Sequence, residues 1–409
     1  MWTAGLPFVL LYLARRARKD ALYGQHVAER FGRYRQRMSG VVWVHAVSLG
    51  ELRSAVPLLR GLLDAGERVV ITNTTPAGRR ASYSAFGDEI ASGQVAVVWV
   101  PFELDWCFAG FFAAFRPKIG LVMEIEIWPR LVQSAKDRGV PLYMCNAQYP
   151  LDSMARDAKF PLRPAVMRRF AGAFVKSQLQ ADRFASLGVE NIHVTGELRF
   201  DQPIPQDQLR AAAALRPQLG GQVIAFASVT EAEEKLFIQT ALDLRARRPG
   251  IVIVFVPRAP ERFDIVAEAL AKSGLCVKRR SLDLDADFSP RFEGAAQVIL
   301  GDSLGEMYFY LALAQRAVIG GGFQPKGSHN IIEPLALGLP VLVGPMIQTI
   351  EYPAVEAMAA GVCKQTSAQT LADDIVNWPS PSPQAIEEFL SAHSGACAKT
   401  LAAIAALAR

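Results

Sequence analysis

Short apolar runs alternate with helical patterns along almost the whole chain, and this alternation limits its fold more than any other feature. The first series of apolar runs lies at residues 41–46, 68–72, 96–100, 119–123, 142–146 and 173–176. The second series lies at residues 223–227, 251–256, 296–300, 317–319 and 341–343. A strand followed by a helix and a further strand is typical of right-handed crossovers in a parallel sheet. We therefore expect an α/β protein.

A proline-containing loop at residues 201–205 separates the two series, and 409 residues are enough for two domains of ordinary size. We expect two facing Rossmann-like domains, at residues 41–200 and 218–380. The remaining segments are an N-terminal arm at residues 1–40, a linker at residues 201–217 and a C-terminal helix at residues 381–409. The alanine-rich C-terminal helix is expected to pack back on the first domain.

The N-terminal arm combines an apolar run at residues 6–13 with a basic stretch that starts at Arg15. The run is shorter than the ~20 residues that a membrane-spanning helix needs. Basic residues beside an apolar segment favour an anionic membrane surface over nucleic acid, for which no motif follows. We expect an interfacial anchor, and a buried N-terminal helix is the simpler alternative.

The segment at residues 317–345 reads AVIGGGFQPKGSHNIIEPLALGLPVLVGP and predicts a strand, a glycine-rich turn, a helix that ends at Gly338, and a second strand. Glycines let a phosphate approach the backbone, and a helix N-terminus offers free N–H groups. Glu333 lies in the first helical turn, where its carboxylate suits a ribose hydroxyl. His329 in the same loop is either a binding residue or a structural histidine. The segment predicts a nucleotide at the carboxyl edge of a parallel sheet.

Two fingerprints of other nucleotide-binding enzymes do not occur in the chain. A GxxxxGK[ST] phosphate loop is missing, and the early helix starts lack GxGxxG, which argues against a dehydrogenase. The five cysteines are scattered without metal-site spacing, so we expect reduced thiols. Asp283, Asp285 and Asp287 lack the spacing of a calcium loop, and we interpret them as solvated charges.

Polar residues gather in four loops that follow apolar runs. Glu51 is either a helix cap or a general base at an interdomain cleft. Glu124 and Glu126, two residues apart, would point to the same side of an extended chain, where like charges raise one pKa; helix N-terminal charge is the alternative. Arg258 suits a phosphate or a surface salt bridge. The loop at residues 302–306 opens a helix, so it is either a simple cap or a cleft-facing turn.

Seven sequence blocks together resemble the 3-deoxy-D-manno-oct-2-ulosonic acid (Kdo) transferases of lipopolysaccharide synthesis, over nearly the whole chain. The blocks are HAVSLGE (45–51), TPAG (75–78), MEIEIWP (123–129), GELRFD (196–201), VPRAPERF (256–263), GDSLGE (301–306) and GGGF…HNIIEP (320–334). They occur in the order typical of that family, and their combination is far more specific than any single block.

The resemblance implies a GT-B fold and transfer of Kdo from CMP-Kdo to a tetra-acylated, bis-phosphorylated lipid A precursor. It implies an inverting enzyme at the cytoplasmic face of the inner membrane, attached through the N-terminus, with no cofactor besides its donor substrate. By the resemblance, Glu51 is the catalytic base, Glu124 a second carboxylate near the reaction centre, and Arg199 a cation that stabilises the transition state. The implied CMP-binding residues are Pro257, Arg258, Leu304, Gly305, Glu306, Asn330, Ile331, Ile332 and Glu333. The matching loops contain no metal-ligand pattern, so no metal is expected.

Several positions depart from the family pattern. Arg199 stands where lysine is usual, which keeps the charge but changes its shape. Thr230 replaces a usual histidine, and Gln148 and Tyr149 stand where an arginine is common. Ser328 replaces a glycine, which predicts less room near the phosphate.

Two other functions fit parts of the sequence. A nucleotide-sugar 2-epimerase would share the second-domain loops but not the basic, apolar N-terminus. A non-catalytic protein that binds sugar nucleotides or lipids would have no need of Glu51, Glu124 and the cation at Arg199.

Overall fold

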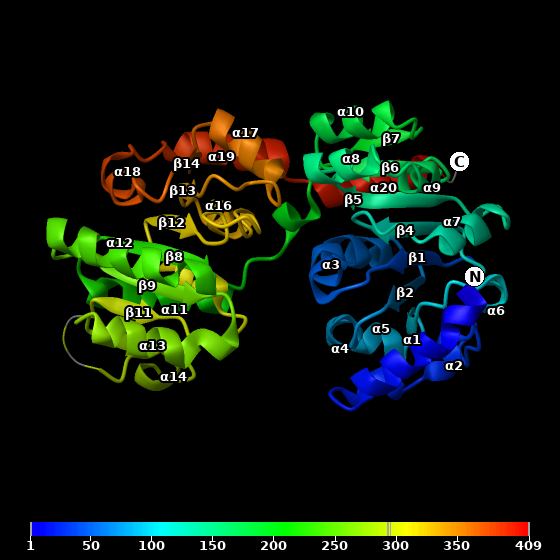
Figure 1. Ribbon diagram of the computed structural model, residues 1–409, viewed down its shortest axis with the longest axis horizontal. Helices are drawn as coiled ribbons and strands as arrows, with labels where there is room; N and C mark the ends of the chain where they lie inside the picture. Colours follow the sequence, from blue (N-terminus) through cyan, green and yellow to red (C-terminus); the bar gives the residue numbers. More distant parts are fainter. Residues whose placement is uncertain (1, 293, 295, 408–409) are drawn as a thin grey trace. The chain divides into compact units, whose positions relative to one another are not determined.

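In the computed structural model, the described residues 2–292, 294 and 296–407 form two α/β units (Figure 1). The first unit extends to Gln202 and resumes at His393, and the second comprises Pro203–Ala392. The chain therefore passes into the second unit once and returns to the first.

The first unit is built on a seven-stranded sheet in the order β3-β2-β1-β4-β5-β6-β7, with every neighbouring pair parallel. The strands are β1 (Val42–His45), β2 (Val69–Asn73), β3 (Val95–Trp99), β4 (Ile119–Met123), β5 (Leu142–Ala147), β6 (Gly172–Val175) and β7 (Ile192–Val194). All residues of β1 to β6 are buried, since helices cover both faces of a parallel sheet.

Two groups of helices cover this sheet. Side chains of α6, α7, α9 and α10 pack on one face, and those of α3 and α20 pack on the other. The helical segments of the unit are α1 (Trp2–Ala17), η1 (Ala21–Gly24), α2 (Val27–Arg30), α3 (Leu49–Asp64), α4 (Pro76–Ala85), α5 (Gly87–Ala91), α6 (Asp105–Phe115), α7 (Pro129–Lys136), α8 (Leu151–Asp157), α9 (Leu162–Met167), α10 (Gln178–Ser186), η2 (Leu198–Asp201) and α20 (Ala396–Leu407). None of the described helices is both long and apolar enough to cross a membrane.

The second unit has its own seven-stranded parallel sheet, in the order β10-β11-β9-β8-β12-β13-β14. The strands are β8 (Val223–Val229), β9 (Val252–Pro257), β10 (Val277–Arg279), β11 (Val298–Leu300), β12 (Arg316–Ile319), β13 (Val341–Val343) and β14 (Cys363–Gln365). Side chains of α12, α13 and α18 pack on one face, while α15 packs against β8, β9 and α11.

The helical segments of the second unit begin with α11, which lies within the expected linker region. They are α11 (Gln206–Leu215), η3 (Arg216–Leu219), η4 (Glu231–Glu233), α12 (Glu234–Arg247), η5 (Pro260–Arg262), α13 (Phe263–Lys272), α14 (Arg280–Asp283), α15 (Met307–Ala312), α16 (Ile332–Ala336), α17 (Glu351–Ala359), α18 (Leu371–Asn377) and α19 (Pro383–His393).

The predicted alternation is confirmed, and each expected apolar run contains a strand. Three short strands, β7, β10 and β14, were not predicted. Each lies at the edge of its sheet and is only partly buried, so its residues do not form an apolar run.

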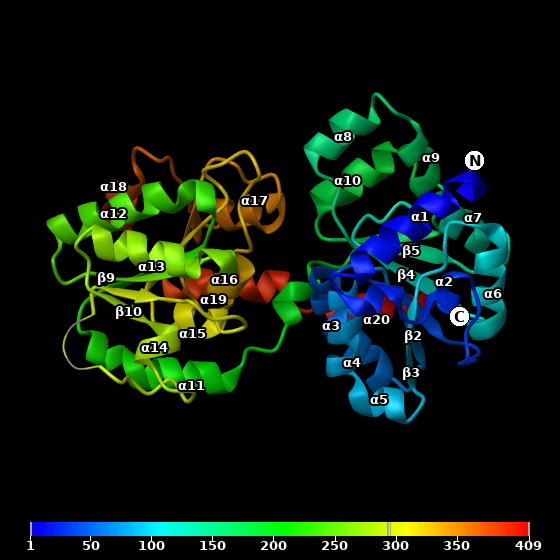
Figure 2. The same cartoon turned by 60° about the horizontal axis from the view of Figure 1, so that its bottom comes forward.

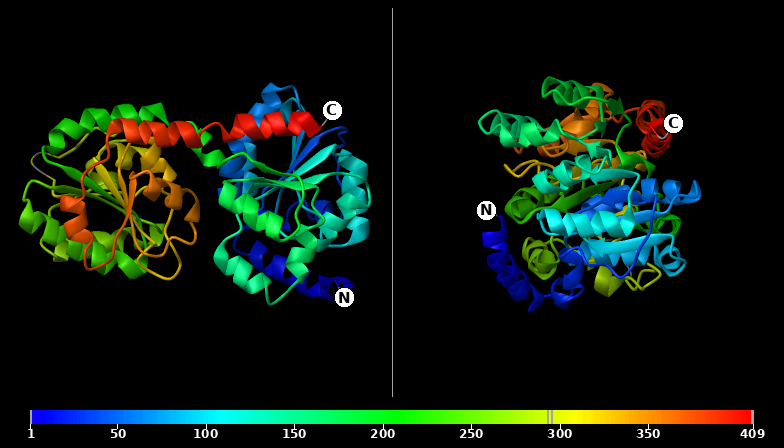
Figure 3. Two further views of the ribbon diagram at one scale, coloured as in Figure 1. Left: turned by 90° about the horizontal axis from the view of Figure 1, so that it is seen from above. Right: turned by 90° about the vertical axis from the view of Figure 1, so that its right-hand side faces the viewer.

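The expected C-terminal helix at residues 381–409 is two helices, and the second of them, α20, packs back on the first unit, as predicted. Helix α20, drawn in red in Figure 3, contacts α3 and η2. Asp201 at the end of η2 accepts hydrogen bonds from the backbone N–H groups of Gly395 (2.7 Å) and Cys397 (2.6 Å), at the start of α20. A side chain at Gly61 of α3 would lie 2.5 Å from Leu401, so the glycine allows the two helices to approach closely.

We expect Asp201→Ala to lower the free energy of unfolding of the first unit by about 1.5–3 kcal/mol, because a charged acceptor for two N–H groups is lost. Urea unfolding followed by tryptophan fluorescence measures this, since Trp43 and Trp99 lie in the first unit's core. Glu387→Ala, at an exposed position of α19, is the control. Equal midpoints for the two variants would contradict the capping role.

Candidate active site

Glu51 lies in the first turn of α3, directly after β1 at the centre of the first sheet. Ser48 caps the helix through its hydroxyl, which accepts from the Glu51 N–H (3.3 Å) and donates to Glu51 Oε1 (2.8 Å). The Val47 N–H donates to the other carboxylate oxygen (2.7 Å). The carboxylate therefore takes part in the local turn through both of its oxygens.

Burial sets the acidity of Glu51. The residue is only 8% exposed, and this burial raises its pKa to about 7. The hydrogen bonds from Val47 and Ser48 oppose the rise, while the nearby negative charges of Glu124 and Glu126 add to it. A carboxyl group with a pKa near neutrality can both accept and release a proton at physiological pH.

Glu124 and Glu126 follow β4, but the expectation that they extend from it side by side is wrong. Glu124 has a left-handed backbone (φ 57°), and its N–H donates to the Cys145 carbonyl (2.7 Å), so the chain turns at once. Glu126 instead accepts from the Trp128 indole N–H (2.8 Å). Burial raises the pKa of Glu126, the Trp128 hydrogen bond opposes this, and Glu124 adds to it.

Arg199 lies in η2 and joins two parts of this site. Its Nη2 lies 3.4 Å from Glu124 Oε1, and its Nε donates to the Ser54 hydroxyl of α3 (2.8 Å). Ser54 follows Glu51 by one helical turn. The structure thus brings the three predicted catalytic residues together at the carboxyl ends of β1 and β4, and their roles stay predictions.

A buried ion pair beneath Arg199 was missed by sequence reasoning. Lys176 Nζ lies 2.6 Å from Glu197 Oε2, and both side chains are more than nine-tenths buried. Asn146 donates to the other oxygen (2.8 Å), and the Arg199 N–H also points to it (3.3 Å). Burial alone would raise the pKa of Glu197, but the charges of Lys176 and Arg199 outweigh it and lower the pKa to about 2. Polar residues at the ends of two apolar runs, Asn146 and Lys176, were the available signal.

In the second unit, Glu233 organises the glycine-rich turn and was also missed. Its carboxylate is fully buried and accepts from the N–H groups of Gly321 (2.6 Å) and Phe323 (2.9 Å). It also accepts from the Thr230 hydroxyl (2.6 Å). These two glycine-turn N–H groups are therefore not open to a phosphate, contrary to the simple interpretation of the glycines.

The loop after β9 carries Arg258 on the surface, with its N–H bound to the Val229 carbonyl (2.8 Å). Pro257 is the last, buried residue of β9. Burial lowers the pKa of His329, and the Arg258 charge lowers it further, so the guanidinium lies near the imidazole. Arg258 and the loop before α16 therefore lie on the same edge of the second sheet.

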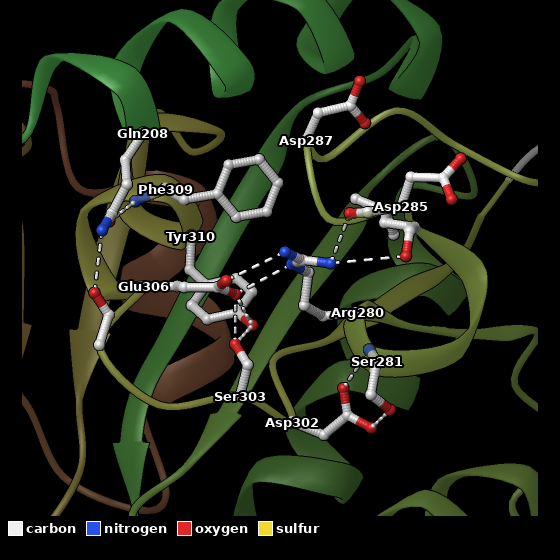
Figure 4. Close-up of polar contacts among 12 residues, drawn as sticks. Gln208, Arg280, Ser281, Asp285, Asp287, Asp302, Ser303, Glu306, Phe309 and Tyr310 are labelled. Carbon is white, nitrogen blue, oxygen red and sulfur yellow. Dashed lines mark hydrogen bonds and ion pairs between the residues drawn. The ribbon is translucent and has the colours of Figure 1, made fainter.

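The loop after β11 is held by Arg279, the last residue of β10, and by Arg280, the first residue of α14. Figure 4 shows the contacts of Arg280. Arg280 makes a two-pronged contact with Glu306 (2.9 and 3.0 Å), and the Ser303 hydroxyl also donates to that carboxylate. Arg279 pairs with Asp302 (2.7 Å). Glu306 therefore shapes the loop, while Leu304 is exposed and Gly305 has a positive φ of 83°.

Residues Asn330 to Glu333 form the turn into α16. Asn330 Oδ1 accepts from the Ile332 N–H (2.9 Å), and the side chains of Ile331 and Ile332 are buried, which leaves only their backbone for a ligand. Glu333 is partly exposed. Burial raises the pKa of Tyr308 to about 12, and the negative charge of Glu333 adds to this rise. Ser328 is 2% exposed and its hydroxyl lies against Gly322, so it is enclosed within the loop.

Among the described residues, no three His, Cys, Asp or Glu side chains are arranged to bind a metal ion. The polar groups at both sheet edges are carboxylates, guanidiniums and backbone amides, which suit proton transfer and anion binding.

The two units with parallel sheets and polar carboxyl edges have the GT-B architecture of sugar-nucleotide enzymes. The fold is similar to that of a putative UDP-N-acetylglucosamine 2-epimerase from Listeria monocytogenes, with a TM-score of 0.58 and 16% identity, covering 90% of this chain and 96% of that one. At this identity the likeness shows the fold alone.

Sequence comparison shows the family. The 3-deoxy-D-manno-octulosonic-acid transferase (kdotransferase) profile matches residues 25–202. The 3-deoxy-D-manno-octulosonic acid transferase of Bordetella pertussis is 37% identical over 416 residues, which cover 97% of this chain and 96% of the relative. That of Haemophilus influenzae is 29% identical, covering 90% and 85%. The chain belongs to the Kdo transferase family, and the resemblance noted from its sequence blocks is confirmed.

We expect Glu233→Gln to destabilise the second unit by about 1–3 kcal/mol, because an amide N–H₂ replaces one oxygen among groups that all donate. Thermal and urea unfolding followed by circular dichroism measures the loss. Glu231→Gln is the matched control, because Glu231 lies two residues away with a 72% exposed side chain. Similar stability of the two variants would show that the glycine turn does not depend on Glu233.

Proposed function

We propose that the protein transfers Kdo from CMP-Kdo to a hydroxyl group of a lipid A precursor, an acylated disaccharide bisphosphate, in lipopolysaccharide synthesis. The family membership supports the Kdo transfer itself. The observation that carries the rest is Glu51, a buried carboxyl with a pKa of about 7 beside the Glu124–Arg199 pair.

In this proposal Glu51 removes the proton from the acceptor hydroxyl as its oxygen attacks the anomeric carbon of Kdo. The bond from that carbon to the CMP phosphate breaks, and CMP leaves with the bonding electrons. A single direct displacement inverts the anomeric configuration. Arg199, held by Ser54 and Glu124, offsets negative charge that develops during transfer.

The second unit binds the CMP part of the donor in this proposal. Arg258 contacts the phosphate, the backbone of residues 304–306 and 330–332 surrounds the nucleotide, and Glu333 accepts from the ribose. Arg258 is exposed, and no carboxylate of the described residues forms an ion pair with it. A guanidinium beside the leaving phosphate supplies charge stabilisation, so the proposed reaction needs no metal and no further cofactor.

The N-terminal helix α1 attaches the enzyme to the cytoplasmic face of the inner membrane in this proposal. Phe8 and Leu11 of α1 are 75% and 70% exposed, and exposed Arg15, Arg18 and Lys19 lie at its C-terminal end. Apolar side chains followed by cations suit the surface of an anionic bilayer.

The relatives also bear on the alternatives. The putative epimerase shares the fold at 16% identity, whereas the Bordetella pertussis transferase is 37% identical over 97% of this chain. A protein that only binds its ligands would have no need of a buried carboxyl group whose pKa is raised toward neutrality.

We expect Glu51→Gln to lower kcat by about 10²- to 10⁴-fold while CMP-Kdo binding is kept, because the amide cannot accept the proton. For the wild type, activity should rise as pH increases through about 7, because the deprotonated carboxylate is the base. The residual activity of the variant should lack this rise. The assay follows CMP release together with the Kdo-modified lipid by mass spectrometry. A variant with near-wild-type turnover would remove Glu51 as the base, and CMP release without a lipid product would contradict transfer.

We expect Arg258→Ala to weaken CMP binding by about 1.5–3 kcal/mol, roughly 10- to 150-fold, because a charged hydrogen-bond donor is lost. Calorimetric titration with CMP measures the change. Arg247→Ala is the control, because Arg247 forms an exposed pair with Asp373 elsewhere on the second unit. Unchanged CMP affinity would show that Arg258 does not contact the phosphate.

A further inference from the structure

The first unit contains a cavity of about 390 Å³ between α1 and the loops that follow β2 and β3. Figure 2 shows α1 lying along this unit. Leu6, Val9 and Leu13 line the cavity from one stripe of α1, and Leu104 and Trp128 also line it. Its size falls within the range of about 300–1,000 Å³ that is usual for small-molecule sites.

One wall of this apolar cavity carries a buried cation that has no acidic partner. Arg30 is 5% exposed, and its Nε and Nη2 have no hydrogen-bond partner among the described residues. Its guanidinium stacks over the Trp99 ring at 4.3 Å, which compensates only part of the lost hydration. The adjacent Glu29 is already engaged by Arg79 (2.6 Å) and by the Trp99 N–H (2.8 Å). Glu103, which also lines the cavity, accepts from the N–H groups of Arg130 (2.9 Å) and Leu131 (3.0 Å).

An unpaired buried cation is unfavourable for stability, because burying a charge without a counter-charge is expensive. An anion brought by a ligand would supply that counter-charge. The exposed Arg16 also lines the cavity, so the positive charge extends to a second residue. A ligand that fits has an apolar chain and an anionic group.

Hydrogen bonds link one wall of the cavity to the turn that holds Glu51. Thr74 and Thr75 line it, and their N–H groups lie 3.4 and 3.3 Å from the Val47 carbonyl. The N–H of the same Val47 donates to Glu51 (2.7 Å). The backbone of Val47 therefore connects the cavity wall to the carboxylate that would act on the hydroxyl group of a lipid.

We propose that this cavity binds one acyl chain of the lipid acceptor, and that Arg30 pairs with an anionic group of the same lipid. The proposal rests on the proposed transfer to a lipid, and it assigns the part of the protein that selects this lipid. The occupant is the acceptor itself, because the cavity wall is linked through Val47 to Glu51 and carries a cation that lacks a partner.

The first test fills the cavity from α1. Val9→Trp places a large ring at a cavity-lining, 38% exposed position, and Ala14→Trp adds the same ring at an exposed position of α1 that does not line the cavity. Kinetics are measured with the acylated disaccharide bisphosphate and with the same disaccharide after its acyl chains are removed. We expect Val9→Trp to raise KM at least tenfold for the acylated acceptor only, and Ala14→Trp to change neither value.

The second test removes the cation. We expect Arg30→Met to raise KM for the acylated, phosphorylated acceptor while the melting temperature stays equal or rises. A purely structural arginine would instead lower the melting temperature when it is replaced. An unchanged KM would overturn the role of Arg30.

The outcomes separate this proposal from the proposed function. If the wild type transfers Kdo to neither acceptor, the proposed function fails. If it transfers Kdo but Val9→Trp and Ala14→Trp give the same KM ratio for the two acceptors, only the cavity assignment fails. Flotation with phosphatidylglycerol vesicles adds a check: weaker vesicle binding by Val9→Trp with an unchanged KM ratio would assign the cavity to bulk membrane lipid and overturn the proposal.

Discussion

In loops that follow the parallel strands, backbone N–H groups donate hydrogen bonds to buried carboxylates. In the second unit, Glu233 accepts from Gly321 and Phe323, which lie about ninety residues later in the chain. In the first unit, Glu51 accepts from Val47, directly after β1. Strands end at these points, so the loops lose the partners that a sheet supplies, and unpaired buried amides are costly. The shape of both candidate binding edges therefore depends on acidic side chains.

The same arrangement gives chemically similar carboxylates different acidities. Glu197 shares its buried position with the cations of Lys176 and Arg199, so its pKa falls to about 2 and it remains a fixed anion. Glu51 has neutral hydrogen-bond donors and two nearby acids, so burial prevails and its pKa rises to about 7. Opposite shifts in neighbouring carboxyl groups separate a structural acid from a candidate base. The first unit thus holds a rigid anion beneath Arg199 and a titrating acid in the turn beside it.

Features that depend on residues close together in the chain could be predicted from the sequence, whereas contacts between distant residues could not. The central strands are apolar because both faces are buried, so their runs are visible, and Glu51 is recognisable because its cap lies three residues away at Ser48. Edge strands such as β10 lack that signal. Glu233 and its glycine turn are joined only by the crossover topology, and no local pattern indicates that pairing. The extended chain expected at Glu124 and Glu126 was wrong, because Glu124 has a left-handed backbone. A non-glycine residue rarely adopts this conformation, so nothing in the sequence indicated it.

Arginines show why the tertiary contacts matter for function as well as for shape. Arg280 has its guanidinium engaged by Glu306 and two backbone carbonyls, so it fixes a loop and has little capacity left for a ligand. Arg258 and Arg30 have no such carboxylate among the described residues, one at the surface and the other buried beside an apolar cavity. The sequence shows all three as arginines in polar surroundings. A guanidinium that is already paired stabilises the local structure, whereas an unpaired one can attract an anion. Arg280 is paired, so its role is structural. This leaves Arg258 and Arg30 as the cations with which anionic parts of the substrates can pair.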